Sequence, residues 1–265
     1  ASMSAVAHLV RSPDLRHGPI RILFPPDEEI GRGTDYVNIE KLGAYAAYTV
    51  DGERRGTLED ETFSADAVQI SIQGVSAHPG FAKNKLENAL KIAGDILNAL
   101  PKDRLSPETT EEREGFIHPV RCTGTQDSAT LDFIIRDFSE EGLAALEQIL
   151  QEITAQVLSG YPNSTSTFRV TPQYRNMKQV LDAHPEVVEY ALLAIERAGM
   201  RPIKRAIRGG TDGSRLSFMG LPCPNIFAGE HAFHSRLEWV SVQDMEKAAE
   251  TLVQLAQIWE EKTAV

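Results

Sequence analysis

Hydrophobic positions recur with different periods in different parts of the chain. Residues 1–10 have apolar side chains at helical spacing, and short continuous apolar runs follow at residues 19–24 and 44–50. Such runs are typical of strands that are buried on both faces of a parallel sheet. Acidic residues come just past each run, at Asp27 and Asp51. We therefore expect carboxylates at the C-terminal ends of two strands, where open α/β sheets place their ligands.

The middle of the chain follows a different pattern. Strand patterns occupy residues 67–73, 116–123, 129–136 and 166–170, and amphipathic helix patterns occupy residues 84–100 and 140–159. The order is therefore strand, helix, strand, strand, helix, strand, which is typical of a ferredoxin-like α+β sandwich. We expect an inserted domain of this kind at residues 63–175.

The last third of the chain returns to the pattern of the first. A helix is predicted at residues 185–198, a short strand at 223–227, and a final helix up to residue 261 that a capping box at Ser241 and Asp244 opens. The sequence thus predicts a larger α/β domain that is built from residues 1–62 and 176–265 and interrupted by the smaller α+β domain.

Composition excludes several classes of function. The 265 residues include 27 Lys and Arg against 38 Asp and Glu, so the net charge is −11. This balance argues against nonspecific nucleic-acid binding, which needs a basic face. No apolar run approaches the roughly 20 residues that span a bilayer, no signal peptide is recognisable, and Cys122 and Cys223 make no disulfide framework. We expect a cytoplasmic protein that binds neither nucleic acid nor membrane.

Three short segments could carry metal chemistry. Glu28 and Glu29 are adjacent after the first predicted strand. Their mutual repulsion favours protonation of one or recruitment of a cation, although a solvated acidic turn is the simpler alternative. Asp51 precedes a glycine and is either a hard metal ligand or part of a turn. His234 offers the imidazole that zinc commonly binds, and His231 is its competitor.

Two further residues could contact a substrate. His78 lies between a predicted strand and a predicted helix, where a polar side chain can face a ligand or simply form a turn. Arg208 begins a glycine-rich segment that matches neither phosphate-binding loop motif. Its guanidinium could hold a substrate carboxylate in a bidentate pair, or form a surface ion pair.

Four segments, in this order, resemble the peptidase T family, the aminotripeptidases of the zinc-dependent aminopeptidase, carboxypeptidase and aminoacylase superfamily. They are residues 22–31 (ILFPPDEEIG), 48–52 (YTVDG), 76–80 (SAHPG) and 207–225 (IRGGTDGSRLSFMGLPCPN), and residues 134–138 (IIRDF) add to the match. The resemblance extends from about residue 5 to residue 260, and the last segment is long enough to be quite specific.

The resemblance implies an α/β catalytic domain with two zinc ions and an inserted lid or dimerisation domain. By motif position, Glu28 resembles the general base that takes a proton from the attacking water. Glu29 and His234 resemble ligands of one zinc ion, and Asp51 resembles a ligand of the other.

The resemblance also implies how a small peptide substrate is held. His78 resembles a residue that steadies the developing oxyanion or the substrate, and that a neighbouring subunit can supply in dimeric relatives. Arg208 resembles a residue near the C-terminal carboxylate of the substrate, and Arg136 is a second candidate for that role. We expect a homodimer that forms through the lid domain.

One part of the family pattern is missing. The family has an H-x-D motif and an aspartate that bridges the two metals, both upstream of the double glutamate, yet none of the seven histidines is followed by x-Asp. We therefore expect the bridging ligand to fall before Ala1. This chain should then bind one zinc ion or none, hydrolyse little, and lack strands of its sheet.

Three functions remain open at this point. The first is a metallo-aminopeptidase that releases the N-terminal residue of tripeptides through a water activated by two zinc ions. The second is a non-catalytic remnant or fragment that dimerises or binds peptides. The third is a dipeptidase or aminoacylase of the same superfamily, against which residues 208–225 favour the tripeptidase.

Overall fold

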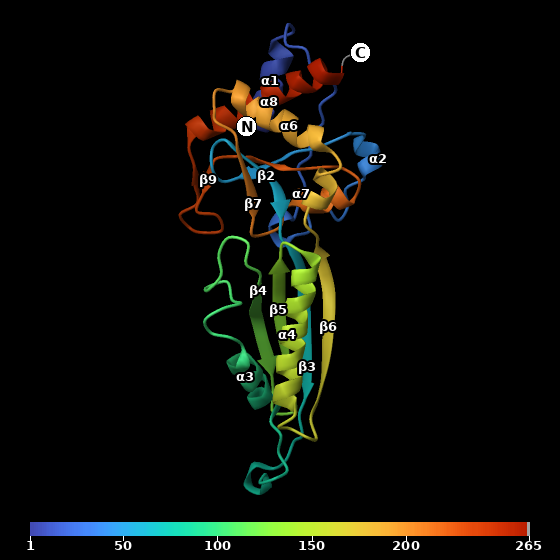
Figure 1. The fold of residues 1–265 in the computed structure, drawn as a ribbon, viewed down its shortest axis with the longest axis vertical. Coiled ribbons are helices and arrows are strands. Elements are labelled where there is room, and N and C mark those ends of the chain that lie inside the picture. Colours follow the sequence, from blue (N-terminus) through green and yellow to red (C-terminus); the bar gives the residue numbers. More distant parts are fainter. Residues whose placement is uncertain (264–265) are drawn as a thin grey trace. The chain divides into compact units, whose positions relative to one another are not determined.

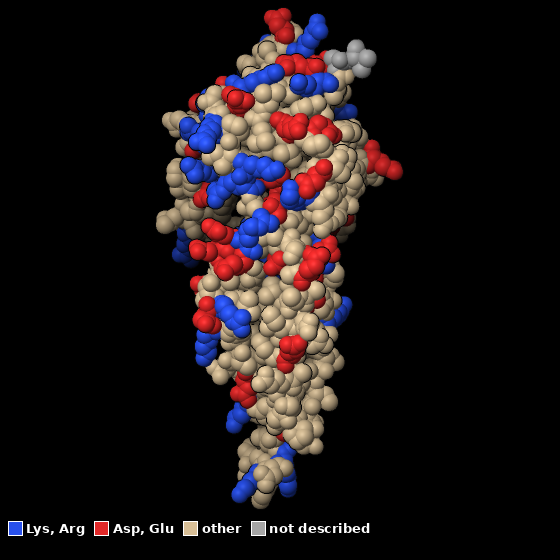
Figure 2. Space-filling model, in the orientation of Figure 1, with Lys and Arg blue, Asp and Glu red and all other residues tan. Residues whose placement is uncertain are grey.

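The computed structural model describes residues 1–263, which form two compact units (Figure 1). The first unit comprises Ala1–Thr62 and Arg175–Val265, and the second comprises Phe63–Tyr174. Within residues 1–263, no helix is both long enough and apolar enough to cross a membrane. Acidic and basic side chains are interspersed over the face that Figure 2 shows.

The sheet of the first unit has four strands in the order β1-β8-β2-β7. These strands are β1 (Thr49–Gly52), β8 (Asn225–Phe227), β2 (Thr57–Thr62) and β7 (Ile203–Ile207). β1 runs parallel to β8 and β2 runs parallel to β7, while β2 and β8 are antiparallel. Consequently β1 and β7 are the two edges of the sheet and point in opposite directions.

Helices pack against this sheet through an apolar cluster. It joins Leu58 of β2 and Ile226 of β8 to α5 (Lys178–Leu181), α6 (Pro185–Arg197) and α8 (Val242–Thr263). α1 (Ser2–Arg11) contacts α8 through Ala5 and Leu9. The unit also contains the short helices α2 (Ile39–Leu42) and α7 (Asp212–Phe218), and the hairpin of β9 (Glu230–His231) and β10 (Trp239–Val240).

The second unit is a four-stranded antiparallel sheet with two helices. The strands, in the order β4-β5-β3-β6, are β4 (Phe116–Gly124), β5 (Ser128–Asp137), β3 (Ser64–Gln73) and β6 (Thr165–Tyr174). The helices are α3 (Ala89–Ala99) and α4 (Glu140–Leu158). Alternate residues of β3 and β5 are buried, because side chains of a strand point to opposite faces in turn.

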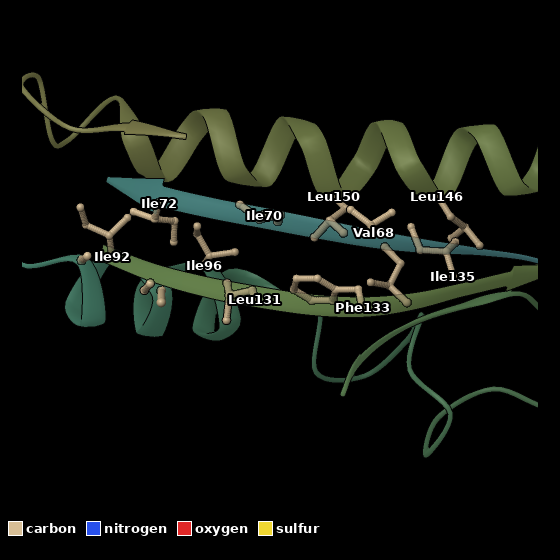
Figure 3. Close-up of a cluster of buried hydrophobic side chains, with 14 of the residues drawn as sticks. Val68, Ile70, Ile72, Ile92, Ile96, Leu131, Phe133, Ile135, Leu146 and Leu150 are labelled. Atoms are coloured by element: carbon tan, nitrogen blue, oxygen red, sulfur yellow. The ribbon is translucent and has the colours of Figure 1, made fainter. Parts of the chain in front are cut away.

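The buried residues of both central strands meet those of the helices. Figure 3 shows Val68, Ile70 and Ile72 of β3 with Leu131, Phe133 and Ile135 of β5, together with Ile92 and Ile96 of α3 and Leu146 and Leu150 of α4. Caps fix where the helices begin: the Ser139 hydroxyl accepts a hydrogen bond from the backbone N–H of Gly142, and the Asn88 side chain accepts one from that of Leu90. This is the predicted strand and helix order of a ferredoxin-like sandwich.

The structure also corrects predicted elements in both units. Residues 19–24 form no strand, so the expectation of a buried strand there is wrong. The run at residues 44–50 becomes strand only from Thr49, and α3 begins at Ala89 rather than at residue 84. Apolar pattern alone cannot tell whether a neighbouring strand is available to pair with. The final helix is confirmed, and the Ser241 hydroxyl accepts a hydrogen bond from the backbone N–H of Asp244.

Candidate active site

The double glutamate lies in a tight turn. Glu28–Ile30 form one turn of 3₁₀ helix, which is bracketed by Asp27 at φ 60° and Gly31 at φ 67°. The N–H of Gly31 donates to the carbonyl of Glu28 at 2.7 Å, and the N–H of Arg32 donates to the carbonyl of Asp27 at 3.0 Å. The left-handed backbone at both ends reverses the chain within a few residues. Glu28 is left half-buried and Glu29 is exposed.

The β9–β10 hairpin separates the two candidate histidines. The His231 ring stacks on Trp239, with ring centroids 4.5 Å apart, so it belongs to the paired base of the hairpin. His234 lies nearer the tip, at φ 58°, and its N–H donates to Glu238 Oε2 at 2.8 Å. The Nε2 atom of His234 is 3.3 Å from Glu29 Oε2, although both side chains are nearly four-fifths exposed. The structure therefore brings Glu29 to His234 and not to His231.

Asp51 lies near the C-terminal end of β1 and is electrostatically coupled to the same turn. Desolvation, followed by repulsion from Glu28 and Glu230, raises the pKa of Asp51 to about 7. The pKa of Glu28 is also raised, first by desolvation and then by Asp212 and Glu29, while His234 opposes the shift. The carboxylates therefore repel one another electrostatically, and such a group favours a bound cation or a shared proton.

Two members of this group were not predicted from the sequence. Asp212 begins α7 and is only 6% exposed. Among the described residues, no hydrogen-bond partner is found for its Oδ2 atom, and a Cβ added to Gly33 would lie 2.3 Å from that atom. Glu230 has a raised pKa because of desolvation and a hydrogen bond with Glu238. The only sequence signal for Asp212 was its place in the glycine-rich segment that follows Arg208.

Arg208 follows a strand that runs in the opposite direction to β1, which carries Asp51. It directly follows β7, which runs antiparallel to β8 through the pairing of β7 with β2. Asp51 lies near the C-terminal end of β1, which is parallel to β8. Arg208 and Asp51 are therefore at opposite ends of the sheet, although Arg208 lies only four residues before Asp212.

The two remaining candidates, His78 and Arg136, belong to the second unit. His78 follows β3, and its Nδ1 atom accepts a hydrogen bond from the N–H of Gly80 at 3.1 Å. Arg136 lies on β5 opposite Ala65, near the start of β3, and its guanidinium is 5.9 Å from the Phe116 ring centroid. At about 3.3 Å per residue along β3, these two candidates are roughly 25 Å apart within the unit.

The described residues offer few ligands for a metal ion. Among them, no group of three or more His, Cys, Asp or Glu side chains is arranged to hold a metal ion. Glu29 and His234 make a pair, whereas catalytic zinc usually has three protein ligands. The side chains of residues 1–263 therefore do not by themselves complete a catalytic zinc site.

Comparison with known proteins adds to this geometry. Residues 61–165 match the peptidase dimerisation domain of the M20 family. The chain is 43% identical over 260 residues to peptidase T of Clostridium perfringens and of Bacillus velezensis, which covers 98% of this chain. This chain is similar to peptidase T over nearly its whole length. It spans 64% of the length of the C. perfringens protein and 63% of the B. velezensis protein.

Solved structures share the fold. A crystal structure of the aminopeptidase PepT from Bacillus cereus matches with a TM-score of 0.78 at 22% identity, covering 96% of this chain and 70% of that chain. A tripeptidase from Staphylococcus aureus matches with a TM-score of 0.80 at 19% identity, covering 96% and 67%. The YXEP protein of Bacillus subtilis, described as a dinuclear metal-binding M20 peptidase, matches with a TM-score of 0.67 at 17% identity, covering 98% and 70%. The predicted α/β fold with an inserted dimerisation domain is confirmed, because it matches the fold of M20 peptidase structures.

Proposed function

We propose that this chain carries the catalytic machinery of a metallo-aminopeptidase that acts on tripeptides. Residues 1–62 and 176–265 would be its catalytic domain, and residues 63–175 its lid and dimerisation domain. The observation that carries the proposal is that Glu28, Glu29, Asp51 and His234 come from three distant segments, that Glu29 pairs with His234, and that Glu28 interacts electrostatically with Glu29, His234 and Asp51. Similarity to peptidase T over nearly the whole chain supports the same conclusion.

Glu28 is the proposed general base. It is half-buried, it adjoins the Glu29–His234 pair, and its pKa is raised. A carboxylate with a raised pKa is a stronger base at neutral pH. It would take a proton from the water that attacks the scissile carbonyl and deliver that proton to the leaving amine.

Glu29 and His234 are the proposed protein ligands of one zinc ion, and Asp51 that of a second. Zinc, when bound, would polarise the scissile carbonyl and lower the pKa of the attacking water. Because the described residues offer fewer than three ligands for either ion, further ligands must come from elsewhere. One ion or none is therefore expected to bind to this chain alone.

Zinc titration by calorimetry tests the ligand pair, and the hairpin supplies a matched control. We expect His234→Ala to weaken zinc binding at least tenfold, and His231→Ala to leave it within a factor of two, because His231 packs on Trp239 instead. Equal losses in both variants, or none in either, would remove His234 from the ligand set.

Hydrolysis of a free-amine tripeptide in the presence of zinc tests the general base. Glu28→Gln should lower kcat at least 100-fold, while Glu40→Gln, an exposed carboxylate on α2, should leave it unchanged. A panel of di-, tri- and tetrapeptides and N-acyl amino acids separates a tripeptidase from a dipeptidase or an aminoacylase. If Arg208 and Arg136 bind the C-terminal carboxylate of the substrate, Arg208→Ala and Arg136→Ala should each raise KM only for substrates with a free carboxylate.

The distance between His78 and Arg136 within the second unit supports a role for a second copy of the chain. A tripeptide extends over only about 10 Å, so His78 and Arg136 of one copy, roughly 25 Å apart, cannot both reach it. We propose that the partner of a homodimer supplies His78. Mixing inactive His78→Ala and Glu28→Gln variants should then restore about a quarter of the wild-type activity, because half of the dimers regain one intact site. No recovery after subunit exchange would contradict this arrangement.

The alternative is a non-catalytic protein that dimerises or binds peptides. The specific observation in its favour is that the described residues form no group of three metal ligands. It predicts that neither the wild-type chain nor Glu28→Gln hydrolyses a tripeptide at saturating zinc, although both still bind it.

A further inference from the structure

Residues 76–86 form a loop between β3 and α3 that projects beyond the strands of the second unit (Figure 1). Its base is closed by Val75 and Glu87, whose backbone N–H groups each donate to the carbonyl of the other, at 2.8 and 2.9 Å. The Glu87 carboxylate accepts further hydrogen bonds from the backbone N–H and Nδ2 of Asn163 and from the Ser164 hydroxyl. Both ends of the loop are therefore fixed to the folded unit.

The loop holds the ring of His78 in one orientation and one tautomer. The N–H of Gly80 donates to Nδ1 of His78 at 3.1 Å, so this nitrogen carries no proton and the neutral imidazole has its proton on Nε2. Among the described residues, no hydrogen-bond partner is found for the Nε2 atom. Because the side chain is exposed, its Nε2–H can donate to a carbonyl oxygen of a ligand.

The ring of Phe81 lies beside that imidazole. The two ring centroids are 5.3 Å apart with the planes inclined by 40°, and the N–H of Phe81 donates to the carbonyl of His78 at 2.8 Å. Phe81 is 74% exposed, and within residues 76–86, all of which are described, no other large hydrophobic side chain is exposed. The loop therefore presents one apolar surface next to one hydrogen-bond donor.

A peptide that accepts the hydrogen bond of His78 comes within reach of Phe81. The carbonyl oxygen that accepts this bond lies about 2.9 Å from Nε2. The side chains of the two residues joined by that peptide bond begin about 3–4 Å from the oxygen, whereas the side chain of the next residue lies about 3.3 Å further along the backbone. The ring of Phe81, centred 5.3 Å from the imidazole, can therefore contact one of the two flanking side chains.

We propose that Phe81 is a specificity-determining residue, whose ring contacts an apolar side chain of the first or second residue of a tripeptide. This role rests on the proposed function, because it takes His78 to contact the substrate. A leucine at either position removes apolar surface from water on the aromatic ring, whereas glycine at both positions gains nothing from it. The copy that supplies His78 also supplies Phe81, because both belong to one loop.

Calorimetric titration with four tripeptides in the presence of zinc tests this role. The probes are Leu-Gly-Gly, Gly-Leu-Gly, Gly-Gly-Leu and Gly-Gly-Gly, and the whole chain carries Glu28→Gln throughout so that the peptides stay intact. Phe81→Ala should weaken the binding of Leu-Gly-Gly or of Gly-Leu-Gly at least tenfold, and should change that of Gly-Gly-Gly and Gly-Gly-Leu less than twofold. Phe81→Tyr, which keeps the ring, should retain the original affinities. Leu90→Ala, at an exposed apolar position on α3, is the matched control and should change none of them.

Four results would overturn this role of Phe81. Equal weakening of all four peptides would show that Phe81 only positions His78, since the loss would not depend on a substrate side chain. Unchanged affinities would show that the ring lies outside the binding site, and weakening confined to Gly-Gly-Leu would place it beside the third residue. The fourth is the absence of binding of any of the peptides.

Hydrolysis of the same peptides by the chain without Glu28→Gln reports separately on the proposed function. Selective binding that depends on Phe81, without hydrolysis, would contradict the peptidase activity of this chain and would leave the role of Phe81 in peptide selection intact. Hydrolysis of all four peptides at rates that Phe81→Ala does not change would support the peptidase and contradict the role of Phe81.

Discussion

Asp51→Asn should stabilise the first unit, and the gain should depend on pH. Desolvation and the neighbouring carboxylates Glu28 and Glu230 raise the pKa of Asp51 from 3.8 to about 7 in the folded protein. The folded state therefore favours the protonated carboxyl, whereas the unfolded chain ionises near the ordinary value. Unfolding releases a proton between these two pKa values, so the free energy of unfolding falls as pH rises through that range.

The magnitude follows from the size of the pKa change. At about 1.36 kcal/mol per pKa unit, the full shift corresponds to a ceiling of about 4 kcal/mol. Asp51 is in contact with solvent, which screens the repulsion, so we expect about 1–2 kcal/mol. Asparagine is uncharged at every pH. The variant should therefore match the wild type near pH 4, gain stability towards pH 7, and keep a constant advantage above it.

Urea unfolding in EDTA at several pH values measures this difference. Both tryptophans, Trp239 and Trp259, belong to the first unit, so their fluorescence reports on the unit that contains Asp51. Glu261→Gln is the control of opposite sign, because its hydrogen bonds with Arg197 lower the pKa of Glu261 and its charge is favourable at neutral pH. A difference between Asp51→Asn and wild type that does not change from pH 5 to pH 8 would refute the reasoning.

Three further substitutions test the packing and the turns. Phe133→Ala leaves a cavity at a fully buried position of the second unit and should lower its free energy of unfolding by about 3–4 kcal/mol. Denaturation followed by circular dichroism measures this change, and a loss below about 1 kcal/mol would mean that the cluster is loosely packed. Ser241→Ala removes the hydroxyl that caps α8 and should cost about 1 kcal/mol in urea unfolding followed by fluorescence, with no change if water replaces the cap. Gly33→Ala places a Cβ 2.3 Å from the Asp212 carboxylate and should lower the melting temperature, while Gly94→Ala on α3, with nothing within 4 Å, should maintain or raise it. Equal effects of the two glycine substitutions would show that the Asp212 side chain moves aside.

The second unit was predictable from sequence because its strands find their partners within the unit. Buried residues alternate with more exposed ones in β3 and β5, which indicates that one face of the sheet is packed against helices. The helix caps at Asn88 and Ser139 mark where those helices begin. Residues 19–24 have an equally clear strand pattern and still form no strand. The hydrophobic pattern of a segment predicts which of its side chains can be buried. Whether the segment forms a strand also depends on a neighbouring strand that can pair with it, and the pattern does not show whether one is present.

The residue types of the candidate site are easier to predict from the sequence than the particular residues that form it. Adjacent glutamates and a loop histidine can be recognised by residue type, but only the stacking of His231 on Trp239 decides which histidine reaches Glu29. Asp212 was overlooked because an aspartate beside glycines also suits a turn. Its burial and its coupling to Glu28 arise from packing between segments about 180 residues apart along the chain. The catalytic and ligand roles themselves stay predictions.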